Sequence, residues 1–180
     1  MVERGSSPRL IQIVGWSGSG KTTLLEALLP LWKQRGLRVA AIKHSGGFPE
    51  LDTPGKDSYR LRSAGAEAVV LVGPERSAVF VDHEPEFFPW EVWVRTLAGL
   101  GADLIAFESF GKAPIPKVEV WRPEVGEAGL RWGGDPLLRA VVAASRPPAW
   151  AGALYSPAET DRISAELLHL ALPFEEVLSR

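Results

Sequence analysis

Residues 15–22 read Gly15-Trp16-Ser17-Gly18-Ser19-Gly20-Lys21-Thr22, between an apolar run at 10–14 and a leucine-rich stretch at 23–29 with helical spacing. Glycines let the backbone wrap a phosphate group, so that N–H groups and a helix N-terminus point at it. In such a loop Lys21 supplies charge for the β- and γ-phosphates, and Thr22 places its hydroxyl on Mg²⁺. A turn that merely caps a helix needs none of this spacing. The stretch therefore predicts a nucleotide-binding P-loop, completed by Thr23.

The composition limits the classes of protein to consider. With 180 residues, 46% of them hydrophobic, the chain is long enough to bury its own core. We expect a flexible tail at residues 1–8 and a single nucleotide-binding domain at 9–180. The net charge of −2 provides no broad positive field, so neither nucleic acid nor a membrane is an expected partner. The absence of cysteine and of an apolar leader segment favours a cytoplasmic location.

The order of the predicted elements indicates an α/β fold: an open, mainly parallel sheet of the P-loop NTPase type, flanked by helices, with a small β-rich excursion. Expected helices follow the P-loop, with a kink or break at Pro30 and a stop at Gly36, and occupy 57–64, 90–100 and 157–170. Expected strands are 10–14, 37–42, 68–72 (buried), 77–81, 104–107, 117–121 and 138–144, the last completing the main sheet.

A magnesium site beside a P-loop also needs a carboxylate at the carboxyl end of a neighbouring strand. Glu108 follows the apolar run 104–107 and meets that requirement, whereas Asp103 lies at the opposite end of the same strand. Asp57 is a second candidate ligand, although an Asp ahead of a helix is equally typical of an N-cap. Asp52 is a weaker candidate for the metal.

Lys43 and His44 directly follow the second predicted strand, where ligand-binding loops of open α/β sheets begin. We expect them to contact phosphate or a second substrate. The polar loop from Lys43 to Lys56 is too long for a simple connection and is a candidate functional loop. Since an isolated histidine is more often a structural hydrogen-bonding residue, a structural role for His44 is the alternative.

Taken together, these motifs resemble the MobB family of molybdopterin-guanine dinucleotide biosynthesis over roughly residues 9–145. The residues that carry the resemblance recur in order, at matching separations. They are Gly15–Thr23, Ile42-Lys43-His44, Lys56-Asp57-Ser58-Tyr59 with Arg62–Ala66, and Glu108 with the run Lys112–Val120.

The resemblance implies a dimeric P-loop protein that binds GTP and Mg²⁺ and hydrolyses GTP weakly. It further implies a role beside the partner enzyme MobA, which attaches GMP to the molybdopterin cofactor intermediate. By the same resemblance, residues 15–23 bind phosphate, Asp57 and Glu108 occupy the acidic positions of the family, and Lys43 and His44 its Lys-His pair.

Some features of the chain leave alternatives open. Family members usually have an aspartate where this chain has Ala143-Ala144-Ser145-Arg146, so the choice between guanine and adenine is not decided by the sequence. A small-molecule kinase that uses ATP and Mg²⁺ is the alternative function, with Arg60 or Arg62 neutralising the transferred phosphate. A nucleotide-binding scaffold without turnover is a third. Residues 110–133, which carry Phe110, Trp121 and Trp132, are the candidate interface with a partner.

Overall fold

The structure is a computed structural model that describes residues 7–47, 51–82, 90–126 and 129–180. The chain divides into two compact units, one made of Met1–His44 with Glu91–Arg180 and one made of Ser45–Trp90. Residues 1–6 of the predicted tail and 48–50 of the predicted functional loop lie outside the described residues. The P-loop belongs to the first, larger unit.

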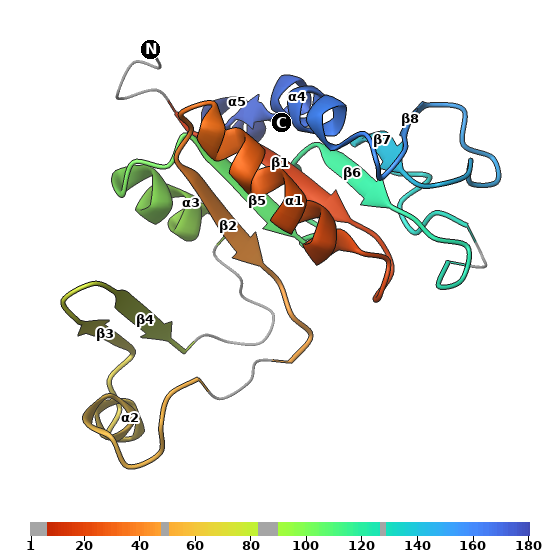
Figure 1. Cartoon of the computed structure of the whole chain (residues 1–180). Coiled ribbons are helices and arrows are strands. Elements are labelled where there is room, and N and C mark those ends of the chain that lie inside the picture. The colour runs from red at the N-terminus through yellow and green to blue at the C-terminus, as the bar shows by residue number, and fades with distance from the viewer. Residues whose placement is uncertain (1–6, 48–50, 83–89, 127–128) are drawn as a thin grey trace. The chain divides into compact units, whose positions relative to one another are not determined.

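The larger unit is built on a seven-stranded sheet in the order β2-β5-β1-β6-β7-β8, with β9 paired to β1 (Figure 1). All pairs are parallel except β1 with β9, which is antiparallel. The strands are β1 (Arg9–Val14), β2 (Val39–Lys43), β5 (Leu104–Glu108), β6 (Lys117–Val120), β7 (Leu138–Val142), β8 (Ala153–Tyr155) and β9 (Leu172–Pro173).

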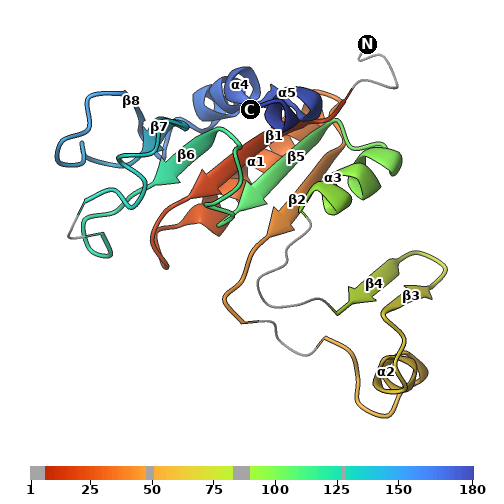
Figure 2. The same ribbon diagram turned by 180° about the vertical axis from the view of Figure 1, so that it is seen from behind.

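Helices cover the sheet on both faces, which explains why the central strands read as nearly continuous apolar runs. Helices α1 (Lys21–Gln34) and α4 (Thr160–Leu170) share one core with β1 and its neighbours, through side chains such as Leu28 and Leu167. Viewed from behind, α1 lies beyond the strands (Figure 2). Helix α3 (Trp90–Gly99) contacts α5 (Phe174–Leu178) through Arg95, which stacks on the Phe174 ring.

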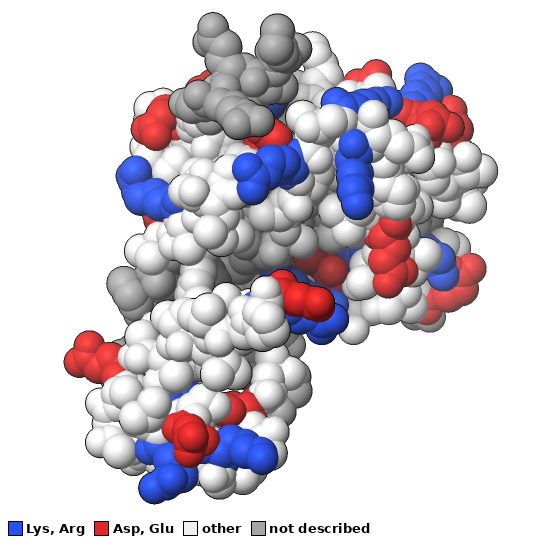
Figure 3. Space-filling view, turned by 60° about the vertical axis from the view of Figure 1, so that its left-hand side comes forward, with Lys and Arg blue, Asp and Glu red and all other residues white. Residues whose placement is uncertain are grey.

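The smaller unit consists of α2 (Asp57–Ser63) and the antiparallel hairpin β3 (Ala68–Val72) with β4 (Ser77–Val81). One face of the hairpin carries Val69 and Phe80, and Arg62 of α2 stacks on Phe80. The other face carries four exposed valines: Val70, Val72, Val79 and Val81. This unit presents a broad surface without charged side chains in Figure 3.

The predicted fold class is confirmed, including the small β-rich excursion, which is the β3–β4 hairpin. The helix after the P-loop is continuous, so the predicted break at Pro30 is wrong. Pro30 is exposed while Leu24, Leu25, Leu28 and Trp32 are buried, so packing of the opposite face holds the helix together despite one missing N–H. Gly36, with φ of 81°, follows the helix end as predicted.

Other corrections concern edges and burial. The second strand begins at Val39 because the backbone of Arg38 is bonded to Asp103, and Asp103 lies at the amino end of β5 as predicted. Strand β3 has the predicted bounds, but only Val69 is buried, because β4 is its sole partner in the described sheet. The strand at 138–142 does not complete the main sheet, because β8 pairs with it and extends the sheet. The helix predicted at 157–170 begins at Thr160, and a short helix, α5, follows it.

The proposed interface at 110–133 is wrong for two of its three aromatic residues. Phe110 and Trp121 are buried inside the larger unit, with 8% and 5% of their surface exposed. Trp121 packs in a second small core that Trp132 and Leu138 also contact. Trp121 and Trp132 therefore stabilise the segment that follows β6, whereas Phe110 packs against Phe107 and His44.

Candidate functional site

The P-loop connects β1 to α1 and takes a conformation that requires glycine. Gly15, Gly18 and Gly20 have φ values of 137°, 76° and 99°. A Cβ atom on Gly15 would lie 2.3 Å from the carbonyl oxygen of Val120, so the loop passes directly against β6. Gly20 is the N-cap of α1, and the first turn of that helix contains no acidic residue. The loop thus leaves backbone N–H groups and the positive helix end available to an anion.

Lys21 lies beneath this loop. Its side chain is buried, and Nζ donates hydrogen bonds to the carbonyl oxygens of Trp16 at 2.7 Å and Gly15 at 3.2 Å. Burial lowers the pKa of Lys21, an effect that the nearby Glu108 carboxylate opposes and the cationic Arg131 and Lys43 reinforce. A buried lysine whose ammonium group donates to backbone carbonyls, with other cations nearby, interacts favourably with an added anion such as phosphate.

Thr22, Glu108 and Lys43 form a compact cluster on the β5 side of the P-loop. The Thr22 hydroxyl donates to Oε1 of Glu108 at 2.9 Å, and Nζ of Lys43 lies 3.1 Å from the same oxygen. Lys43 Nζ is also 3.5 Å from the Thr22 oxygen. A cation therefore contacts both oxygens that the sequence assigns to Mg²⁺. Hydroxyl and carboxylate oxygens are the ligands that Mg²⁺ prefers, so the residues present fit this ion.

The register of the sheet produces this cluster. Ile13 pairs with Glu108 on β5, and Val14 pairs with Glu119 on β6. The P-loop leaves β1 between these two carboxylates. Because Lys43 pairs with Glu108 across β2 and β5, the predicted Lys43 and Glu108 sites meet at one sheet edge.

His44 follows Lys43 and is held by structural contacts. Its backbone N–H donates to the Glu108 carbonyl at 2.9 Å, and its ring stacks edge-on against Phe110 at 5.4 Å between centroids. These contacts agree with the structural alternative. A role of His44 in binding phosphate or substrate stays a prediction.

The predicted acidic residues of the smaller unit have local partners. Asp57 is the first residue of α2 and not its N-cap, which is Lys56; its side chain is 95% exposed and pairs with Arg60 at 3.5 Å. Asp52 is buried, accepts a hydrogen bond from Ser58 at 2.8 Å and pairs with Arg62 at 3.6 Å. Asp52 thus has a structural role, and metal binding by Asp57 stays a prediction.

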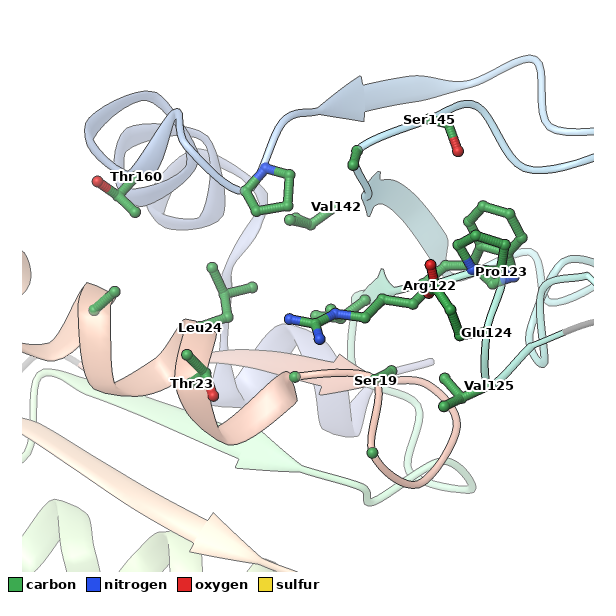
Figure 4. Close-up of a pocket in the computed structure, with 17 residues that line it drawn as sticks. Ser19, Thr23, Leu24, Arg122, Pro123, Glu124, Val125, Val142, Ser145 and Thr160 are labelled. Carbon is green, nitrogen blue, oxygen red and sulfur yellow. The ribbon is translucent and has the colours of Figure 1, made fainter.

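A pocket of about 630 Å³ lies on the β6 side of the P-loop (Figure 4). Gly18–Gly20 and Thr23 form one wall, and Leu24, Ala27, Val142 and Pro157 supply apolar surface. Ser145 and Thr160 add polar groups, whereas the Arg146 guanidinium donates to the carbonyls of Trp150 and Gly152. Apolar walls with a few polar groups are typical of a site for a nucleoside.

Two residues beside this site were not singled out from the sequence. Glu119 is fully buried and accepts backbone hydrogen bonds from Arg131 at 2.7 Å and Trp132 at 2.9 Å. Burial raises the pKa of Glu119 despite these bonds. The signal in the sequence was a carboxylate between the two valines of β6. The second residue is Arg122, whose side chain reaches into the pocket (Figure 4).

Trp16 links the P-loop to the segment that Glu119 holds. Its indole N–H donates to the Gly129 carbonyl at 3.1 Å, and Arg131 stacks on its ring. The buried Ser19 hydroxyl has no hydrogen-bond partner in the described part of the chain. Ser17 lies in the turn between them.

In the described ranges, no group of three or more acidic or histidine side chains is arranged to hold a metal unaided. Nor does any described helix combine the length and apolarity needed to cross a bilayer. The cytoplasmic location stays a prediction.

The glycine-rich loop at the carboxyl end of β1, the buried lysine and the adjacent pocket define the class as a P-loop nucleotide-binding fold. The family model described as "Molybdopterin guanine dinucleotide synthesis protein B" matches residues 10–144. The chain belongs to this family, MobB.

Relatives and solved structures agree with this assignment. The chain is 40% identical over 116 residues to the molybdopterin-guanine dinucleotide biosynthesis adapter protein of Haemophilus influenzae, covering 64% of this chain and 65% of that protein. The Escherichia coli adapter protein is 36% identical over 65% of this chain and 67% of its own length. The match thus spans just under two thirds of the first relative.

Two crystal structures share the fold. The one titled molybdopterin-guanine biosynthesis protein B superposes with a TM-score of 0.66 at 30% identity, over 89% of this chain and 99% of its own. Bacillus subtilis MobB superposes with a TM-score of 0.70 at 25% identity, over 91% and 98% of the two chains.

Proposed function

We propose that this protein is a GTP-binding adapter with weak GTPase activity in molybdopterin-guanine dinucleotide biosynthesis, acting with MobA. The observation that carries the proposal is the P-loop flanked by the Thr22–Glu108 pair on one side and the pocket on the other. Membership of the MobB family supports the pathway. The names of the relatives support the adapter role.

In the proposed complex, the loop amides and Lys21 bind the β- and γ-phosphates. Thr22 and Glu108 hold Mg²⁺, which neutralises phosphate charge when bound. Lys43, now in contact with both oxygens, moves away from them and remains near enough to pair with phosphate. Two protein ligands leave most of the coordination shell to phosphate and water, as is usual for Mg²⁺.

We expect hydrolysis to be slow because of the groups that surround this cluster. Lys43 lies beside the Thr22–Glu108 pair and in this complex pairs with phosphate, so it supplies no general base for an attacking water. Glu108 is engaged by Thr22 and, in this proposal, by the metal. We therefore expect an intrinsic rate of GTP hydrolysis well below about 1 per second. The bound nucleotide, GTP or GDP, then controls binding of the partner by changing the order of the loops around the site.

We further propose a homodimer, supported by the valine face of the β3–β4 hairpin. An isolated two-stranded sheet is marginally stable, and Val72 is 74% exposed. Pairing with a second copy would bury this face. The molybdopterin intermediate remains the proposed cargo of the MobA complex.

The kinase alternative has less support. Arg62 pairs with Asp52 and Asp82, and Arg60 pairs with Asp57, so both arginines serve ion pairs within the smaller unit. A kinase would need one of them on a transferred phosphate.

Calorimetric titration of GTP and ATP, each with and without Mg²⁺, tests the proposal. Mg²⁺-dependent preference for GTP supports it. A titration with purified MobA then tests the adapter role, by comparing the affinity of MobA for this protein in the presence of GTP and of GDP. Preference for ATP, together with phosphate transfer to a small acceptor, would establish the kinase instead.

A further inference from the structure

Arg122 is the only basic residue among those that line the pocket beside the P-loop in the described part of the chain. It is the second residue after the end of β6, and its carbonyl accepts hydrogen bonds from the N–H groups of Val125 and Gly126. This turn fixes the backbone from which the side chain projects. Figure 4 shows the side chain extending across the pocket toward the start of α1.

The guanidinium lies against the P-loop itself. A Cβ atom added to Gly20 would be 3.2 Å from Nη2 of Arg122 and 3.6 Å from its Cζ and Nε. No ion pair or side-chain hydrogen bond holds this guanidinium within the described residues. With respect to these residues its N–H donors are available to a ligand, and a guanidinium matches phosphate oxygens in a bidentate geometry.

The strand order indicates which phosphate Arg122 meets. Glu108, which binds Thr22, ends β5 on one side of β1, whereas Arg122 follows β6 on the other side. Thr22 and Glu108 would hold the Mg²⁺ that neutralises the β- and γ-phosphates, which would place these two phosphates toward β5. The pocket that suits the nucleoside lies toward β6. The phosphate nearest the nucleoside, and hence nearest Arg122, is the α-phosphate.

We propose that Arg122 is a nucleotide-binding residue that binds the α-phosphate, on the opposite side of the P-loop from Lys21. This assignment rests on the proposed nucleotide function. Arg122 then sets the affinity for nucleoside di- and triphosphates alike, and it takes no part in the steps at the γ-phosphate. The buried, unpartnered Ser19 hydroxyl on the same pocket wall is consistent with a polar ligand there.

The test compares the wild type with Arg122→Ala and Arg122→Lys in calorimetric titrations with GTP and GDP in Mg²⁺. Loss of a charged hydrogen-bonding pair predicts roughly ten-fold or greater weakening by Arg122→Ala, by the same factor for both nucleotides. Arg122→Lys recovers part of the lost affinity, since lysine keeps the positive charge but lacks the planar guanidinium that binds phosphate through two N–H groups. Arg139→Ala, an exposed arginine near the amino end of β7, is the matched control and stays at wild-type affinity.

Phosphorus NMR of bound GDP supplies a direct readout. We expect the α-phosphorus resonance to shift more than the β-phosphorus resonance between wild type and Arg122→Ala. Unchanged affinity in Arg122→Ala, or a loss confined to GTP, overturns the assignment to the α-phosphate. If the wild type binds neither nucleotide, the proposed function itself fails. If the wild type binds and Arg122→Ala binds equally well, only the assignment of Arg122 fails.

Discussion

The Thr22 hydroxyl donates a 2.9 Å hydrogen bond to the Glu108 carboxylate, which joins the first turn of α1 to the end of β5 across 86 residues of sequence. This pair is the basis of the proposed Mg²⁺ site. Replacing Glu108 by Gln keeps an acceptor for Thr22 and removes the charge that a divalent cation needs.

We expect Glu108→Gln to reduce the Mg²⁺-dependent part of GTP affinity about ten-fold, with little effect on binding without the metal. Calorimetry at several Mg²⁺ concentrations measures this. Asp57→Asn is the informative comparison, because Asp57 is the other predicted ligand. An equal loss in Asp57→Asn would establish its metal role, and an unchanged Glu108→Gln would remove Glu108 from the site.

Lys21→Ala should abolish measurable nucleotide binding while leaving the protein folded. The amine is the buried charge beneath the loop, and its lowered pKa indicates that desolvation opposes the charged form in the folded state. Removing the amine relieves this cost of desolvation but also removes the hydrogen bonds to the carbonyls of Trp16 and Gly15, so we expect only a small change in the thermal midpoint. Calorimetry and thermal unfolding check both parts, and wild-type affinity in the folded variant would contradict the site.

Gly15→Ala should destabilise the fold by about 2 kcal/mol or more, since its Cβ would meet the Val120 carbonyl at 2.3 Å in a conformation that already favours glycine. Gly36→Ala is the matched control. Gly36 also has positive φ, but nothing lies within 4 Å of its Cβ position, so we expect a cost of only about 1 kcal/mol. Denaturant unfolding compares the two; equal costs would mean that the contact with β6 is unimportant.

Glu119 predicts a pH dependence of stability. Burial raises the pKa of its carboxyl above the ordinary value of 4.5, so the folded state holds this proton more tightly than the unfolded state. The stability contributed by this group is fully present below pH 4.5 and is lost as the pH rises through the raised pKa. Relative to Glu119→Gln, which does not titrate, the wild type should gain free energy of unfolding on acidification from pH 7 toward 4.5. A constant difference across this range would show that Glu119 has an ordinary pKa.

A charge on the valine face of the hairpin should dissociate the proposed homodimer. Val70 is 60% exposed in the single chain, and burying Asp there without a partner predicts a more than ten-fold rise in the dimer dissociation constant in Val70→Asp. Sedimentation equilibrium measures it. Val92→Asp, at a 55% exposed position on α3, is the control. A wild-type monomer, or an unaffected Val70→Asp dimer, would contradict this interface.

Local sequence determined the P-loop, the fold class and most strand bounds, because spacing of glycines and alternation or continuity of apolar residues are properties of short segments. Glu108 was also predictable, since a carboxylate at the end of an apolar strand lies at the ligand-binding edge of a parallel sheet. The predicted break at Pro30 was wrong because packing of Leu28 and Trp32 outweighs a single lost hydrogen bond on the exposed face.

Only the tertiary structure decided which residues meet. The placement of β5 and β6 on opposite sides of β1 brings Glu108 to Thr22 and Arg122 to Gly20, although each pair is about a hundred residues apart in the chain. Nothing in the sequence near Arg122 indicates that strand order. Likewise, the burial of Trp121 and the exposure of β3 depend on which elements cover them, and such long-range packing is not encoded in any local pattern.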